Sequence, residues 1–101
     1  MQINVDELKI AHNEVENRFE IWIDNQLSKL DYMQDDDTIV MTHVGVHPDQ
    51  RGQGVAGKLT EVALVYAREK SWRVIPMCSY VAAYIRRHPE YAGLTKQRTG
   101  E

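Results

Sequence analysis

The sequence predicts a single α/β domain in which antiparallel strands are followed by a strand, a helix, a strand and a helix. Three observations support this prediction. Apolar and polar residues alternate in the first half of the chain, a helical apolar period begins at Val55, and a short apolar segment follows that helix. A strand, a long helix and a further strand in succession favour parallel pairing. We therefore expect a mixed sheet in a minimal single domain.

Size, charge and cysteine content limit the class of protein. The 101 residues, 43% of them apolar, suit one core, which we place in residues 1–95 with a polar tail at 96–101. A net charge of -3 without a basic cluster argues against nucleic-acid binding. Cys78 is the single cysteine, and no apolar leader or membrane span is evident. We expect a cytoplasmic protein with neither nucleic-acid nor membrane partners.

The first half of the chain should form four strands, at residues 8–12, 19–23, 27–32 and 38–46. Asp24 and Asn25 suit a tight hairpin, because both residue types tolerate positive φ. The run of aspartates at 35–37 suits the next turn. That run could attract a cationic amine, but a solvated turn explains it as well. It lacks the spacing of a calcium loop, so we predict no metal site.

The second half should form a helix, a strand and another helix. The first helix begins at Val55, a strand spans 73–77, and Ser79 is expected to cap a helix at 80–87 that Pro89 prevents from continuing. One apolar face of the first helix is made by residues at helical spacing, namely Val55, Leu59, Val62, Ala63 and Tyr66.

A glycine-rich loop joins the fourth strand to the first helix. Small residues there allow close backbone approach, and the free amides of a first helical turn suit phosphate oxygens. Arg51 and Lys58 lie where the helix dipole prefers acids, at a cost of roughly 0.3–1 kcal/mol per cation, and no Asp or Glu occurs at 50–60. A bound diphosphate would make this arrangement of cations favourable. The alternative is that the glycines only make a tight turn; other phosphate-loop patterns fit poorly.

This loop resembles that of the GNAT N-acetyltransferase superfamily, whose Arg/Gln-x-x-Gly-x-Gly/Ala signature is matched by Arg51-x-x-Gly54-x-Ala56. The segments 43–46, 51–54 and 76–80 are similar to those of a small single-domain branch with His and Cys motif residues. The resemblance implies a GNAT-like fold that binds acetyl-CoA, with the diphosphate on the loop and pantetheine along the strand. The residues implied for coenzyme A are Val44, Gly45, Val46, Gln50, Arg51, Gly52, Gln53, Gly54, Val55, Ala56, Gly57 and Lys58.

The sequence departs from larger members of that superfamily between its first strands. Those members carry one or two helices there, which help to form the acceptor pocket, and residues 13–17 are too few for them. The acceptor is therefore the part of the function that the sequence specifies least.

His43 and Cys78 are the leading catalytic candidates. Strand alternation places Ile39, Met41, His43 and Gly45 on one face, so His43 stands beside a position without a side chain. Imidazole suits a general base near neutral pH, although a lone histidine on an apolar face is often a hydrogen-bonded core residue. Cys78 precedes a helix, where peptide dipoles promote a thiolate. The alternative is an inert buried thiol.

The resemblance implies that Cys78 and His43 work together, with Cys78 as a transient acetyl carrier. It also implies that a tyrosine on the last helix, Tyr84, protonates the departing thiolate. Tyr80, Ala83 and Tyr84 form one helical stripe, which could equally serve packing alone.

The leading hypothesis is therefore an acetyl-CoA-dependent N-acetyltransferase acting on an amine of a small molecule or a protein lysine. The first alternative is a non-catalytic module that binds or senses acyl-CoA. The second is an interaction domain in which the glycine-rich turn is only structural.

Overall fold

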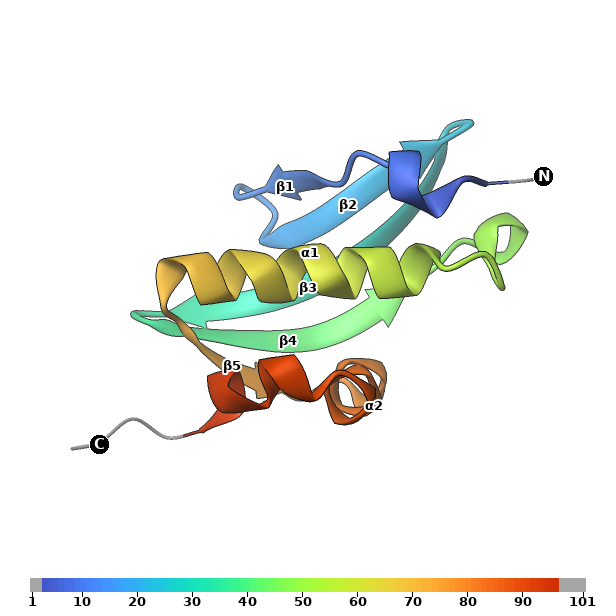
Figure 1. The fold of residues 1–101 in the computed structure, drawn as a ribbon. Coiled ribbons are helices and arrows are strands. Elements are labelled where there is room, and N and C mark those ends of the chain that lie inside the picture. The colour runs from blue at the N-terminus through green and yellow to red at the C-terminus, as the bar shows by residue number, and fades with distance from the viewer. Residues whose placement is uncertain (1–2, 97–101) are drawn as a thin grey trace.

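A computed structural model describes residues 3–96 and shows a mixed five-stranded sheet with helical segments (Figure 1). The strand order is β1-β2-β3-β4-β5, with antiparallel pairs up to β4 and a parallel β4–β5 pair, which confirms the predicted fold class. Of the expected tail at 96–101, only residue 96 lies in the described range. The elements are η1 (Val5–Glu7), β1 (Ala11–Asn13), β2 (Arg18–Ile23), β3 (Gln26–Asp35), β4 (Thr38–Gly45), η2 (Pro48–Gln50), α1 (Val55–Lys70), β5 (Arg73–Pro76), α2 (Ser79–Arg87) and η3 (Pro89–Thr95).

Helix α1 lies across the sheet and covers its core (Figure 1). Val55, Leu59 and Ala63 are buried as predicted, whereas Val62 and Tyr66 are half-buried. The buried face also takes in Thr60, Leu64 and Ala67, and it packs against strand residues such as Phe19, Leu30 and Ile39. No helix in residues 3–96 is long and apolar enough to span a membrane.

Several predicted boundaries need correction. The first strand covers Ala11–Asn13, because residues 5–7 form a short 3-10 turn after Asn4, whose side chain accepts a hydrogen bond from the Asp6 amide. The third strand continues to Asp35, and positive φ occurs at Asp36. The β2–β3 turn matches expectation, with positive φ at both Asp24 and Asn25.

The second helix also begins differently from the prediction. Ser79 is its first residue, and Cys78, with an extended backbone, occupies the cap position without a side-chain cap hydrogen bond. The predicted cap at Ser79 is therefore wrong by one residue. The preceding strand ends at Pro76, so Met77 and Cys78 alone connect it to the helix.

A β-bulge interrupts the pairing of β3 with β4. Asp31 pairs with His43, but the next residue, Tyr32, pairs with Met41, so Thr42 is the extra residue. Its hydroxyl donates a hydrogen bond to the Asp31 carbonyl at 3.2 Å. Beyond the bulge the alternation of side chains inverts. The prediction that His43 and Gly45 share a face with Ile39 and Met41 is therefore wrong.

The sheet has a covered face and an outer face. Helix α1 lies on the covered face, and α2 and η3 lie beside it at the β5 end (Figure 1). The outer face carries the residues that alternate with the core positions. Its cross-strand pairs include Trp22–Leu27, Glu20–Lys29, Arg18–Asp31, Lys29–Gly45, Asp31–His43 and Met33–Val40.

Candidate functional site

The site begins where β4 and β5 separate. Their parallel register runs from Thr38↔Arg73 to Met41↔Pro76, and the Cys78 amide then donates to the Met41 carbonyl at 2.9 Å. After that hydrogen bond the chain turns into α2, while β4 continues to Gly45. The last part of β4 therefore offers backbone groups on its β5 side, as an added strand would require.

A cavity of about 500 Å³ wraps this edge of β4. A second cavity of about 280 Å³ lies at the start of α1, and the two share Val46, Arg51, Ala56 and Tyr80. They form one groove from the glycine-rich loop to the separated strands. The larger cavity is lined by Leu27, Lys29, His43, Val44, Gly45, Val46, His47, Arg51, Ala56 and Tyr80.

The start of α1 is built to receive an anion. Gly54, at the cap position, has φ of 85° and supplies no side-chain cap, and the first turn holds no acidic residue. Gly52 also adopts a positive φ of 76°. The uncapped amides and the helix dipole leave this end positive. Lys58 Nζ lies 3.3 Å from Glu61 and lines neither cavity, whereas Arg51 lines both.

A buried polar network anchors the loop from below. Gln50 and Ser28 are fully buried, and the Ser28 hydroxyl donates to Gln50 Oε1 at 2.5 Å. The His47 amide donates to Ser28 Oγ at 2.9 Å, and Gln50 Nε2 donates to the Gln26 carbonyl at 3.0 Å. Gln50 borders the second cavity, but both ends of its amide are engaged by the protein. Its side chain thus positions the loop.

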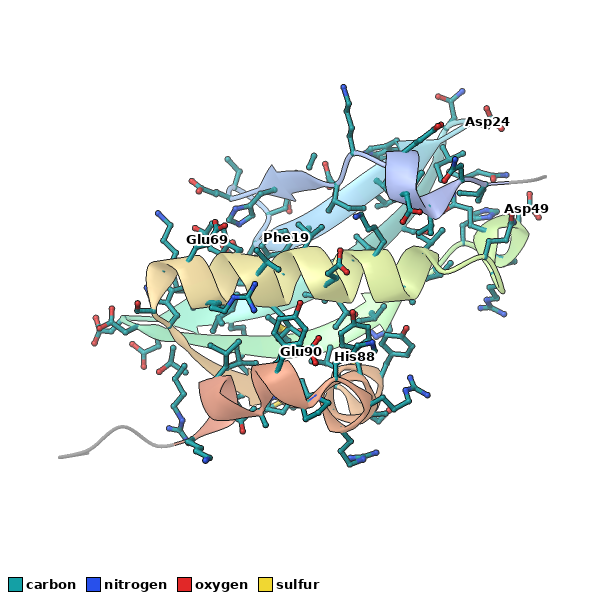
Figure 2. The ribbon with its side chains drawn as sticks, viewed as in Figure 1. Phe19, Asp24, Asp49, Glu69, His88 and Glu90 are labelled. Atoms are coloured by element: carbon teal, nitrogen blue, oxygen red, sulfur yellow. The ribbon has the colours of Figure 1, made fainter. Side chains whose placement is uncertain are left out.

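Two outer contacts hold the same loop. Gln26 Nε2 donates to Asp49 Oδ2 at 2.8 Å, and the Ile3 amide donates to Gln53 Oε1 at 2.9 Å. Figure 2 shows Asp24, at the tip of the β2–β3 hairpin, and Asp49 at the same end of the molecule. The sequence alone predicts neither these tethers nor the buried network below the loop. The one available signal for the network was a serine, Ser28, at a core-facing strand position.

His43 is exposed and lies on the outer face at the larger cavity. A Cβ atom built on Gly45 would stand 3.0 Å from His43 Nε2, so the imidazole lies directly over the glycine. The imidazole itself thus takes up the space over Gly45, and both residues lie on the outer face of the sheet. His47 is half-buried, lines the cavity and accepts a hydrogen bond from the Asp49 amide at 3.2 Å.

Cys78 is a half-buried free thiol at the separation point. Its amide is bonded to Met41, two residues before His43, but Cys78 lines neither cavity of the groove, whereas His43 lines the larger one. Helix α2 begins immediately after Cys78, and its first turn holds no acidic side chain.

The tyrosines of α2 differ in their access to the groove. Tyr80 lines both cavities. Tyr84 is buried and lines neither; its ring stacks on His88 with 3.9 Å between centroids. Burial, with a smaller contribution from Glu61, raises the pKa of Tyr84 to about 12. Figure 2 shows His88 and Glu90 on the side of α1 where α2 lies.

Other predicted features lie outside the groove. The Asp35–Asp37 turn joins the opposite end of β4. His12 Nε2 lies 2.6 Å from the Tyr32 hydroxyl, and the His12 ring stacks on Phe19. Burial lowers its pKa, which suits a neutral ring in an aromatic cluster. A third cavity of about 320 Å³ borders this cluster at the side of α1.

Comparisons with known proteins agree on one group. The family model described as GCN5-related N-acetyl-transferase matches residues 18–94. The chain is also similar to a GCN5-like protein from Staphylococcus aureus whose solution structure was solved by NMR. The two share 28% sequence identity and a TM-score of 0.70, over 93% of this chain and 94% of that chain. A search of curated proteins finds no match.

The buried network generates a stability prediction. Gln50→Ala should lower the free energy of unfolding by about 1–3 kcal/mol, because it leaves the Ser28 hydroxyl and the Gln26 carbonyl without their buried partner. Chemical denaturation measures this difference. Gln34→Ala, at an exposed glutamine of β3, is the matched control and should stay within about 0.5 kcal/mol of the parent. Equal losses in both variants would contradict an anchoring role.

Proposed function

The chain belongs to the GCN5-related N-acetyltransferase family, and from this premise we propose that it is an acetyl-CoA-dependent N-acetyltransferase with an amine acceptor. One observation carries the proposal. A single groove leads from an uncapped, acid-free helix start to the edge of β4 where β4 and β5 part; His43 lines this groove, and the Cys78 amide is bonded to Met41 at the point of separation. The first end suits diphosphate, and the second suits a thioester. The single free thiol fits the cytoplasmic location that we also propose.

The proposed donor would occupy the groove in the order of its chemical groups. The amides that follow Gly54 would bind the diphosphate with help from Arg51. The edge of β4 from Thr42 to Gly45 would pair with the pantetheine amides, as an added strand does. The acetyl group would then reach the separation point beside Cys78.

Charge reversal of Arg51 tests the diphosphate end. Arg51→Glu should weaken acetyl-CoA binding at least about tenfold, because it removes a charge-assisted contact and adds repulsion. Isothermal titration calorimetry measures the dissociation constant. Arg87→Glu makes the same charge change at an exposed position of α2 outside both cavities, and it should bind like the parent. An interaction domain with a purely structural loop would bind no coenzyme A in any variant.

The proposed chemistry has two steps. The Cys78 thiolate attacks the thioester carbonyl, a carbon–sulfur bond forms to Cys78, and the bond to coenzyme A sulfur breaks. The departing thiolate takes a proton. The acceptor amine then attacks the acetyl carbon, the bond to Cys78 breaks, and His43 accepts the amine proton. Exposure of His43 allows it to return that proton to water.

Replacement of Cys78 tests the covalent route. The parent should gain the mass of one acetyl group on incubation with acetyl-CoA, and Cys78→Ala should not. The variant should also lose most of its transfer rate while it keeps acetyl-CoA affinity. Intact-mass spectrometry measures the acetylation of the protein, and a discontinuous assay measures the rate of acetyl transfer. Unchanged transfer would instead indicate direct attack by the amine, and binding without any transfer would indicate a non-catalytic acyl-CoA module.

The thiolate needs a proton donor, and Tyr80 is the tyrosine that we propose for this role, because it lines both cavities. Tyr84 stays a prediction from the sequence, and its pKa of about 12 keeps its phenol protonated. Tyr80→Phe should lower kcat about 10²-fold or more with little change in acetyl-CoA affinity. Tyr84→Phe is the matched variant and should change kcat less. Steady-state kinetics decide between them, and a larger loss at Tyr84 would reverse the assignment.

A further inference from the structure

The ionisable side chains of Lys, Arg and His that line the groove are all basic. In residues 3–96 no Asp or Glu lines either cavity of the groove, whereas Lys29, Arg51 and the imidazoles of His43 and His47 line the larger one. The nearest acids in the strand register and the loop are already paired, Asp31 with Lys29 itself and Asp49 with Gln26. Asp31 Oδ2 lies 3.2 Å from Lys29 Nζ, and Asp49 Oδ2 accepts from Gln26.

Lys29 and Arg51 lie at different ends of the groove. Arg51 also lines the cavity at the start of α1, where the diphosphate is proposed to bind. Lys29 lines only the larger cavity, and it pairs across the strands with Gly45, over which His43 lies. Lys29 is therefore the cation beside the reacting end. Its side chain is about one third exposed, and an ammonium that contacts Asp31 retains further N–H donors.

This arrangement disfavours an acceptor with a second positive charge near its amine. The basic lining would repel such a molecule, and the aspartates at 35–37 cannot compensate. That turn precedes β4, and the five residue steps from Thr38 to His43 span roughly 16 Å. A positive surrounding also favours the neutral form of an amine, which is the form that attacks.

We infer that the acceptor is a small amine carrying an anionic group, a carboxylate or a phosphate, and that Lys29 binds this group. The inference rests on the proposed acetyl transfer. The anionic group would offset the repulsion from the groove and place the amine next to His43. A cavity of about 500 Å³ suits a small molecule beside the acetyl end of the donor.

A matched acceptor series tests this inference. 4-Aminobutanoate, butylamine and 1,3-diaminopropane present an amine on the same propylene chain and differ in the far group. The expected kcat/KM falls in that order, with at least tenfold between the first and the last. 3-Aminopropyl phosphate distinguishes phosphate from carboxylate as the preferred anion. The highest kcat/KM for the diamine would overturn the inference.

Variants of Lys29 separate recognition of the acceptor from binding of the donor. Lys29→Met should raise KM for 4-aminobutanoate about tenfold or more, leave butylamine unchanged and keep acetyl-CoA affinity, and Lys29→Glu should favour the diamine. Arg18→Met removes an outer-face cation that pairs with Glu20 outside the cavity, and it should preserve the parent order. A loss of acetyl-CoA affinity in Lys29→Met would assign Lys29 to the donor and overturn the inference.

Failure of the proposed function gives a different result. A parent protein that binds no acetyl-CoA would contradict the proposed function itself. A parent protein that binds acetyl-CoA should show shifts of the Lys29 and His43 amide signals in NMR spectra on addition of 4-aminobutanoate. If that acetyl-CoA complex shows no such shifts and no acetylation of 4-aminobutanoate, the inference about the acceptor is overturned, while the proposed function is not.

Discussion

The bulge at Thr42 is the constraint on which the geometry of the site depends. One extra residue in β4 reverses the side-chain alternation, so that Met41 stays in the core while His43 reaches the outer face. Without it, His43 would share the face of Met41 and compete with apolar side chains for space under α1. The bulge also lies where β4 loses its pairing with β5. A local irregularity in one strand thus decides which β4 side chains face the groove, and it lies at the point where the groove opens.

A second constraint keeps the loop in place without using the groups that a ligand needs. A helix start can bind an anion only if its amides have no side-chain cap, and such a start lacks the usual local support. Here the support comes from the core, through Gln50 and Ser28, and from the tethers at Asp49 and Gln53. The binding surface and the holding contacts therefore use different atoms of the same short segment. This separation explains why a polar pair is buried under the loop.

The mixed sheet, α1 and the glycine-rich loop could be predicted from the sequence, because each depends on local periodicity or local backbone preference. Residues at helical spacing after Val55 and the αL-tolerant pair Asp24-Asn25 carry such signals. The bulge could not be predicted, since the register of β4 depends on β3, which is distant in the chain. The same limit applies to Tyr80 and Tyr84, because only the position of α2 beside Gly57 decides which ring reaches the groove. The place of Lys29 in the groove likewise depends on the pairing of β3 with β4, so it could not be predicted from the sequence.

The outer face of the sheet has a practical consequence for experiments. The chain contains two tryptophans, and they report on different layers. Trp22 lies on the outer face and is 58% exposed, whereas Trp72 is half-buried and packs edge-on against Tyr66. Indole emission depends on contact with water, so the unlabelled protein carries one optical probe at the wet surface of the sheet and one internal reference. Events on that surface can therefore be followed by intrinsic fluorescence.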